Sequence, residues 1–181
     1  MINLKQDTGG PALEPLILQM TEGSTQALAD LYRETKTAVY ALAFSILRNR
    51  HSAEDIMQET YIKAYQSAGS YVPMGKPMAW LLTIAKHLSL MKLRAESGRF
   101  EALDDALPDA GFEPCTLDRL TLEIAMSALS PEERQIVSLH AIAGLKHRET
   151  AELMGLPLAT VLSKYHRALS KLKKRLKEEG L

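Results

Sequence analysis

Cysteine is almost missing from this sequence of 181 residues, which contains one, Cys115. The chain by itself can therefore form no internal disulfide and no zinc site built on cysteines. Aromatic residues are few, with three phenylalanines and one tryptophan. The ten glycines and eight prolines provide few points at which a helix would be interrupted. Leucine, alanine, lysine and glutamate are abundant instead, and these residues favour helices.

Long apolar runs are also absent. No stretch approaches the roughly 20 apolar residues that span a membrane. The first residues, MINLKQDTGGPALEP, lack the basic start and apolar core of a signal peptide. We therefore expect a cytoplasmic protein without membrane insertion. Its composition, 46% hydrophobic and 24% charged, is that of a globular chain with room for one domain or two small ones.

The formal net charge is zero, but the charges are unevenly distributed. Between residues 146 and 177, nine lysines and arginines face two glutamates, which gives a formal net charge of +7 there and −7 over the rest. A basic end on an otherwise acidic chain indicates a polyanionic partner at that end and a different partner elsewhere. A solvated, lysine-rich helix face is the alternative explanation.

Apolar residues recur at helical spacing in most of the chain, and no alternating strand pattern, hairpin signal or internal repeat is found. Local signals place several helix starts. Ser52 with Asp55 is expected to cap the helix that follows RNRHS, Pro77 to open the next one, and Ser130 with Glu133 to cap another. The fold class predicted is all-α.

The helical pattern stops near residue 98. From 101 to 113 the carboxylates have no cation among them; they are Glu101, Asp104, Asp105, Asp109 and Glu113. We interpret residues 98–115 as an acidic flexible linker between two small helical domains. The predicted organisation is a polar tail at 1–14, a first domain at 15–97, the linker at 98–115, and a second domain at 116–181 that contains a helix-turn-helix.

The helix-turn-helix prediction depends on HRETAELMGLPLATVLSKYHRAL, residues 147–169, in which Gly155 and Pro157 join two helical segments. In this motif the second helix enters the DNA major groove by its N-terminal end. One side of that helix is an apolar packing stripe, formed by Val161, Tyr165, Leu169, Leu172 and Leu176. Another side is polar and basic, formed by Thr160, Ser163, Lys164, Arg167 and Lys171. The alternative is a generic two-helix hairpin on a basic surface.

The segment SAEDIMQETYIKAY, residues 52–65, begins as an acidic amphipathic helix. Its cluster of Glu54, Asp55 and Glu59 suggests either a solvated face or a metal site. We expect no metal, because His51 is only three residues before Glu54 and no other ligand set is nearby. No cofactor is expected either.

Together with the rest of the chain, this segment resembles the signature of extracytoplasmic-function (ECF) sigma factors, two-domain members of the bacterial sigma-70 superfamily. That signature reads A-E-D-[ILV]-x-Q-E-[TV]-[FY]. The matching residues are Ala53, Glu54, Asp55, Ile56, Gln58, Glu59, Thr60 and Tyr61. Three more blocks are similar to family segments: 31–47 to the preceding helix, 79–94 to the promoter-melting and −10-binding helix, and 129–172 to the −35-binding domain.

The resemblance implies that residues 15–97 are sigma region 2, that residues 116–181 are sigma region 4, and that the chain directs core RNA polymerase to specific promoters. Its implied partners are core polymerase, promoter DNA and an anti-sigma factor that grips the two domains, since no further domain follows Leu181. The linker would thread the basic cleft of polymerase as an RNA mimic. The alternative is that it packs on the second domain and masks it.

Three sets of site residues follow from the resemblance. For the polymerase clamp helices they are Asp55, Gln58 and Glu59. For the −10 element they are Trp80, Lys86, His87, Lys92 and Arg94, beside a base-reading loop, GSYVPMGK. For the −35 element they are the polar face named above, with Lys171 on phosphate. Two alternatives stay open, because Trp80 could be a buried core residue and Asp55 could cap its own helix.

This chain departs from the family pattern at three positions in or beside these sets. Leu162 stands where a lysine or arginine is often found, Lys164 where arginine is usual, and His87 where asparagine is frequent. Lysine lacks the rigid fork with which arginine contacts guanine, so the promoter sequence is not predicted.

Two other classes of protein compete with the sigma factor. A stand-alone helix-turn-helix regulator would bind DNA without polymerase. A helical enzyme is disfavoured, since the five histidines include no His-x-x-x-His pair and no glycine-rich phosphate loop is present. We expect a protein that is not an enzyme.

Overall fold

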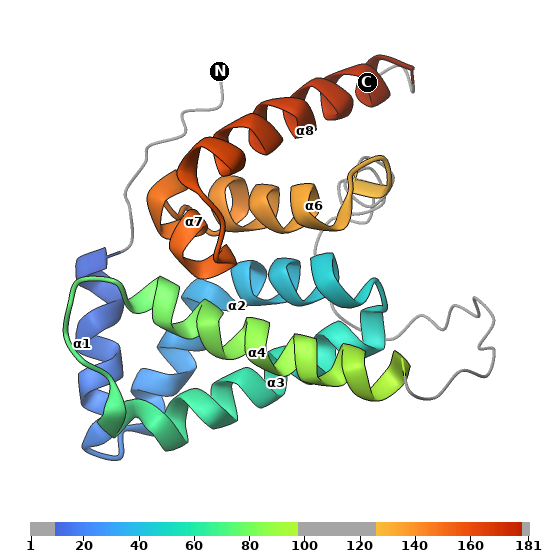
Figure 1. The fold of residues 1–181 in the computed structure, drawn as a ribbon. Coiled ribbons are helices and arrows are strands. Elements are labelled where there is room, and N and C mark those ends of the chain that lie inside the picture. The colour runs from blue at the N-terminus through green and yellow to red at the C-terminus, as the bar shows by residue number, and fades with distance from the viewer. Residues whose placement is uncertain (1–9, 98–125, 179–181) are drawn as a thin grey trace.

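The computed structural model describes residues 10–97 and 126–178, and within these ranges the secondary structure is helical, with no strand (Figure 1). The first unit contains α1 (Gly10–Thr21), α2 (Thr25–Leu47), α3 (Arg50–Ser67), the 3-10 turn η1 (Ala68–Ser70) and α4 (Pro77–Ser97). The second contains α6 (Pro131–Val137), the π-helical turn η2 (Ser138–Ile142), α7 (His147–Met154) and α8 (Leu158–Glu178). Helix α1 begins inside the predicted polar tail. The predicted linker lies outside the described residues.

Helix α3 begins earlier than predicted. The side-chain oxygen of Asn49 accepts the backbone N–H of Ser52 at 2.9 Å, so Asn49 is the cap. The prediction that Ser52 caps this helix with Asp55 was wrong. Asparagine caps helices as well as serine does, and here it comes three residues earlier. Ser52 is instead buried, and its hydroxyl donates to Glu96 of α4 at 3.1 Å. Asp55 therefore has no capping role.

Helix α2 lies at the centre of the molecule. It packs against α1, α3 and α4 and also against α6 and η2 of the second unit (Figure 1). Leu42 of α2 and Leu81 of α4 belong to the same buried cluster as Leu139 and Leu145 of the second unit. Full burial of one such leucine stabilises the fold by about 1.5–3 kcal/mol. The two units therefore share a hydrophobic core.

The start of α6 is as predicted. The Ser130 hydroxyl accepts the backbone N–H of Glu133 at 3.3 Å, and the Glu133 carboxylate accepts the backbone N–H of Ser130 at 2.8 Å. This reciprocal pair satisfies two donors that the first turn of a helix otherwise leaves free. It fixes where the second unit's first described helix begins.

The helix-turn-helix is formed by α7 and α8. Gly155 ends α7 with φ of 66°, a left-handed conformation that glycine adopts at little cost. Ala151 is buried where the two helices cross and packs with Ile136 and Val161. The small side chain at the crossing allows α7 and α8 to approach closely.

The packing stripe of α8 differs from the predicted one at one position. Val161 and Ala168 are fully buried. Tyr165 packs against the clusters of both, and Leu172 packs against the cluster of Ala168. Leu169 is 41% exposed, so its assignment to the stripe was wrong. Residues seven apart return to the same side of a helix, and Ala168 rather than Leu169 keeps that register with Val161.

Candidate nucleic-acid interface

The polar face predicted on α8 is accessible. Ser163, Arg167 and Lys171 are exposed, and Thr160 and Lys164 are half-buried. The Arg167 guanidinium donates to the Ser163 carbonyl at 3.4 Å, which keeps its long side chain along the helix. Thr160, Ser163, Lys164 and Arg167 lie in the N-terminal half of α8, the half of a recognition helix that reaches base edges, and Lys171 follows in the other half.

The two lysines of this face are already ion-paired. Lys164 Nζ lies 2.6 Å from Glu132, and Lys171 Nζ lies 2.7 Å from Glu133. Burial alone would raise the pKa of Glu133, but the hydrogen bonds from Lys171 and from the Ser130 backbone outweigh it and hold that pKa below its ordinary value. Sequence reasoning missed both pairs, because only the packing of α6 on α8 brings the charges together.

The five residues predicted for the −10 element do not share one face of α4. Lys86 points to the second unit, where its Nζ donates to the Leu153 carbonyl of α7 at 2.6 Å, and burial lowers its pKa. Lys92 points to α3 and pairs with Asp55 at 2.9 Å. His87 and Arg94 are exposed. Trp80 is half-buried.

Trp80 is held against the loop that precedes α4. Its ring meets the buried Tyr71 ring edge to face, with centroids 5.2 Å apart. In the same loop Val72 is 65% exposed and Met74 is 72% exposed. Trp80 is therefore neither a fully buried core residue nor a fully exposed DNA contact, since one side of it packs in the fold and the other remains accessible.

Two residues of α4 were missed by sequence reasoning. Thr83 and Met91 are exposed. They lie at helical spacing with His87 and Arg94, at intervals that return to one side of the helix. The outer row of α4, defined here as Thr83, His87, Met91 and Arg94, is therefore a continuous surface. The spacing is visible in the sequence, but sequence reasoning assigned no DNA contact to Thr83 or Met91.

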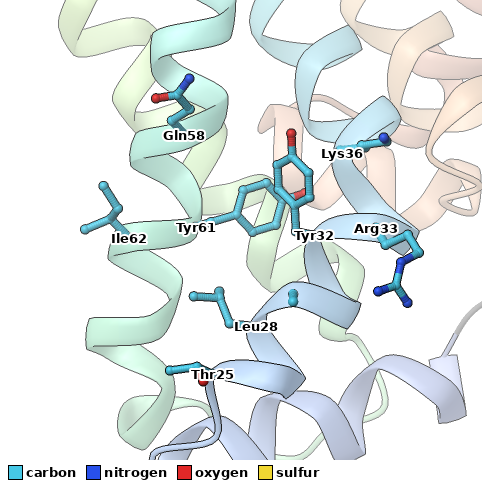
Figure 2. Close-up of a pocket in the computed structure, with 9 residues that line it drawn as sticks. Thr25, Leu28, Tyr32, Arg33, Lys36, Gln58, Tyr61 and Ile62 are labelled. Carbon is cyan, nitrogen blue, oxygen red and sulfur yellow. The ribbon is translucent and has the colours of Figure 1, made fainter. Parts of the chain in front are cut away.

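The three residues predicted for polymerase binding lie together on α3. Asp55, Gln58 and Glu59 are all exposed. Beside Gln58 a groove runs between α2 and α3, and Figure 2 shows Gln58, Tyr61 and Ile62 on one wall of it. Ile62 is 56% exposed, an unusual degree for an isoleucine. The acidic face of α3 therefore continues into an apolar one.

The opposite wall of this groove comes from α2, with Leu28, Tyr32, Arg33 and Lys36 drawn in Figure 2. The Tyr32 and Tyr61 rings, one from each wall, meet edge to face with centroids 4.9 Å apart. Sequence reasoning did not find the groove, since it needs the relative position of two helices.

No group of three or more potential metal ligands occurs in residues 10–97 and 126–178. No helix in that part of the chain is both long and apolar enough to cross a membrane.

Comparison with known proteins identifies the family. The model of sigma-70 region 2 matches residues 31–99, and that of sigma-70 region 4 matches residues 119–172. The ECF RNA polymerase sigma factor SigK of Mycobacterium sp. (strain KMS) is 30% identical over 171 residues, which covers 89% of each chain. The chain belongs to the ECF sigma factors. SigW of Bacillus subtilis (strain 168) is 30% identical over 179 residues, covering 90% of this chain and 95% of SigW.

Solved structures have the same fold as this sigma factor. CnrH in complex with the cytosolic domain of CnrY superimposes with a TM-score of 0.64 at 21% identity, covering 92% of this chain and 98% of CnrH. RpoE from Bartonella quintana, in complex with the anti-sigma factor NepR, gives a TM-score of 0.63 at 25% identity, covering 82% of this chain and 97% of RpoE.

The family membership confirms the resemblance, the all-α fold and the function drawn from the sequence. This sigma factor directs core RNA polymerase to promoters in transcription initiation, and the stand-alone regulator is not favoured. The domain boundaries and the roles of individual residues stay predictions.

Proposed function

We propose that this sigma factor meets its partners through three separate helix faces and acts in the cytoplasm without catalysing a reaction itself. The acidic face of α3 would bind core polymerase, the outer row of α4 the −10 element, and the polar face of α8 the −35 element. The observation that carries the proposal is that each face presents exposed polar residues on a different helix: Gln58 on α3, His87 on α4 and Arg167 on α8.

The polymerase contact would combine charge with apolar area. Asp55 and Glu59 would steer α3 towards basic residues of the clamp helices, because complementary charges accelerate association and fix the orientation. Ile62 and the groove beside it would supply the desolvated centre on which affinity usually depends.

On α8 we assign base reading to Arg167 and phosphate contacts to the lysines. Arginine can form a bidentate contact with guanine, and Arg167 is exposed. Lys164 and Lys171 are partly neutralised by Glu132 and Glu133, so phosphates would have to compete for them. Such contacts fix the position of the protein on DNA rather than read its sequence.

Promoter binding would require the two units to separate. The −10 and −35 elements lie about 25 base pairs apart, which is about 85 Å of duplex at roughly 3.4 Å per base pair. Helix α8, with 21 residues, is only about 30 Å long. In the packed arrangement Lys86 is also held by the Leu153 carbonyl. We infer that core polymerase binds first and draws the units apart.

An anti-sigma factor is the third partner that we propose. RpoE, which this chain resembles in fold, was solved in complex with one. Such an inhibitor could hold the two units in their packed arrangement and cover both DNA-binding faces at once.

The test measures promoter binding by the reconstituted holoenzyme on two promoters, one intact and one with a scrambled −35 element. Arg167→Ala should weaken binding to the intact promoter by about 1–3 kcal/mol, roughly 5- to 150-fold. It should change binding to the promoter with the scrambled −35 element little. Lys173→Ala, on another side of α8, is the matched control. Equal losses from Arg167→Ala on both promoters would make Arg167 a phosphate contact. No binding of core polymerase at all would overturn the proposal.

A further inference from the structure

Three imidazole rings and a phenol gather where η2, α7 and α8 meet. The rings of His140 and His147 are stacked, with centroids 3.8 Å apart and planes 22° from parallel. Tyr165 of α8 sets its ring edge to face against both, at 4.8 Å and 4.9 Å. His166 follows beside Tyr165 at 6.2 Å. None of the three proposed binding faces uses this cluster.

The hydrogen bonds of the stack fit a neutral His147 ring. His140 Nδ1 lies 2.7 Å from the Leu145 carbonyl, which can only accept, so this ring nitrogen is the donor. His147 Nδ1 is buried and has no hydrogen-bond partner among the described residues. A neutral imidazole can leave one nitrogen bare, whereas a charged one carries two N–H donors that both need acceptors. A proton on His147 would therefore leave a buried donor unsatisfied.

The charges around His147 also oppose a proton. His140 of η2 and Tyr165 of α8 contact the His147 ring, and His166 of α8 acts on it electrostatically. The charged residues at or in α7 are Lys146, Arg148, Glu149 and Glu152, and the cations that reach α7 from α4 and the residue before it are Lys86 and Lys76. The two carboxylates are engaged elsewhere: Glu149 accepts the Lys146 backbone N–H at 2.8 Å, and Glu152 pairs with Lys76 at 3.0 Å. Burial first, and then His140 and His166, lower the pKa of His147.

We propose that His140 and His147 form an acid-sensitive lock of the helix-turn-helix. While the His147 ring is neutral, its stack with His140 holds α7 and η2 against Tyr165 of α8. When His147 takes up a proton, this contact opens and the polar face of α8 loses the support that positions it. The lock itself depends only on packing; its effect on DNA rests on the proposed −35 role of α8.

The direction of the pH effect follows from the lowered pKa of His147. Well above its ordinary value of 6.5, the ring is neutral in the folded and unfolded chain alike, and the stack contributes fully. As pH falls below 6.5, the unfolded chain takes up a proton that the folded one resists, so stability falls until the lower folded pKa is reached. Each unit of that pKa difference changes the folding equilibrium about tenfold.

The first experiment compares urea unfolding of the full chain at about pH 7.5 and about pH 5.5, across the range in which histidine titrates. The variants are the wild type, His147→Gln, and His51→Gln as the matched control, because His51 is an exposed histidine on α3. The wild type and His51→Gln should lose stability on acidification, and His147→Gln should lose much less. The same acid loss in His147→Gln as in the wild type would overturn the lock.

The second experiment needs no variant. Titration of the wild-type histidine ring signals by NMR should give a pKa for His147 below 6.5, and a value at or above 6.5 would overturn the proposal. Binding of a −35 duplex, measured at the same two pH values, should weaken with acid in the wild type. Lost stability with unchanged duplex binding would refute control of DNA binding by the stack, whereas the Arg167→Ala test judges the −35 role of α8 independently.

Discussion

Replacing Glu133 by Gln and by Ala should separate two contributions that one side chain makes. Its carboxylate accepts the Ser130 backbone N–H at 2.8 Å and the Lys171 ammonium at 2.7 Å, and the residue is only 4% exposed. The first contact starts α6, and the second joins α6 to α8. Glutamine can still close a capping box, but it carries no charge for Lys171. Alanine provides neither contact.

The expected magnitudes follow from these contacts. Loss of a helix cap costs about 1 kcal/mol. The Lys171 side chain is 46% exposed, so solvent screening limits the ion pair to about 0.2–1 kcal/mol. We therefore expect Glu133→Gln to lower the free energy of unfolding by less than about 1 kcal/mol, and Glu133→Ala by about 1–2 kcal/mol. The pKa of Glu133 is held low, so the charge contribution is complete above about pH 4.5 and is lost as pH falls through the lower folded pKa.

Urea unfolding followed by circular dichroism measures these values. Glu132→Gln is the matched control on the same turn, since Glu132 is 49% exposed and holds only Lys164. A second readout is the salt dependence of −35 duplex binding. Releasing Lys171 for a phosphate should steepen the slope of log affinity against log salt by about 0.9. If Glu133→Gln and Glu133→Ala lower the free energy of unfolding equally, the side chain does not make separate contributions through the helix cap and through its charge.

Two further predictions concern the first unit. Asp55→Asn should lower affinity for core polymerase while stability changes by less than about 1 kcal/mol, since the pair with Lys92 is 68% exposed on the Asp55 side; unchanged affinity in a fluorescence binding assay would contradict the role of α3. Tyr61→Phe removes a 2.7 Å hydrogen bond to Thr35, which still donates to the Leu31 carbonyl, and should cost about 1 kcal/mol. Burial raises the pKa of Tyr61 well above 10, so its contribution to stability is complete below about pH 10 and falls above it. The fall in alkaline unfolding curves should therefore be smaller in the variant.

Features that depend on neighbouring residues were predictable from the sequence. Ser130 with Glu133 starts α6, and Gly155 ends α7 in a left-handed turn, because capping rules act within one turn of helix. The prediction of where α3 begins was wrong because capping rules consider only neighbouring residues. Asn49 and Ser52 can both cap, and the sequence does not rank two equally good caps that stand three residues apart.

Features that depend on distant residues were predictable only in part. The resemblance selected residues of suitable type on α4, but packing divides them, since Lys86 turns to α7 and Lys92 to α3. The sequence does not say that α2 of the other unit buries Leu139 and Leu145. Periodicity identifies an inward side of a helix and leaves its neighbour unspecified.

The shared core sets the order of events at a promoter. Separating the units would expose Leu139 and Leu145, which costs about 1.5–3 kcal/mol for each, and would leave Lys86 without its carbonyl partner. A −35 duplex alone gains nothing from separation, because the polar face of α8 is already exposed in the packed form. Core polymerase can offset the cost, since binding through α3 adds an interface that the packed form does not provide. If this order is right, the free protein binds a −35 duplex, and the −10 and −35 elements are bound together only after polymerase has bound.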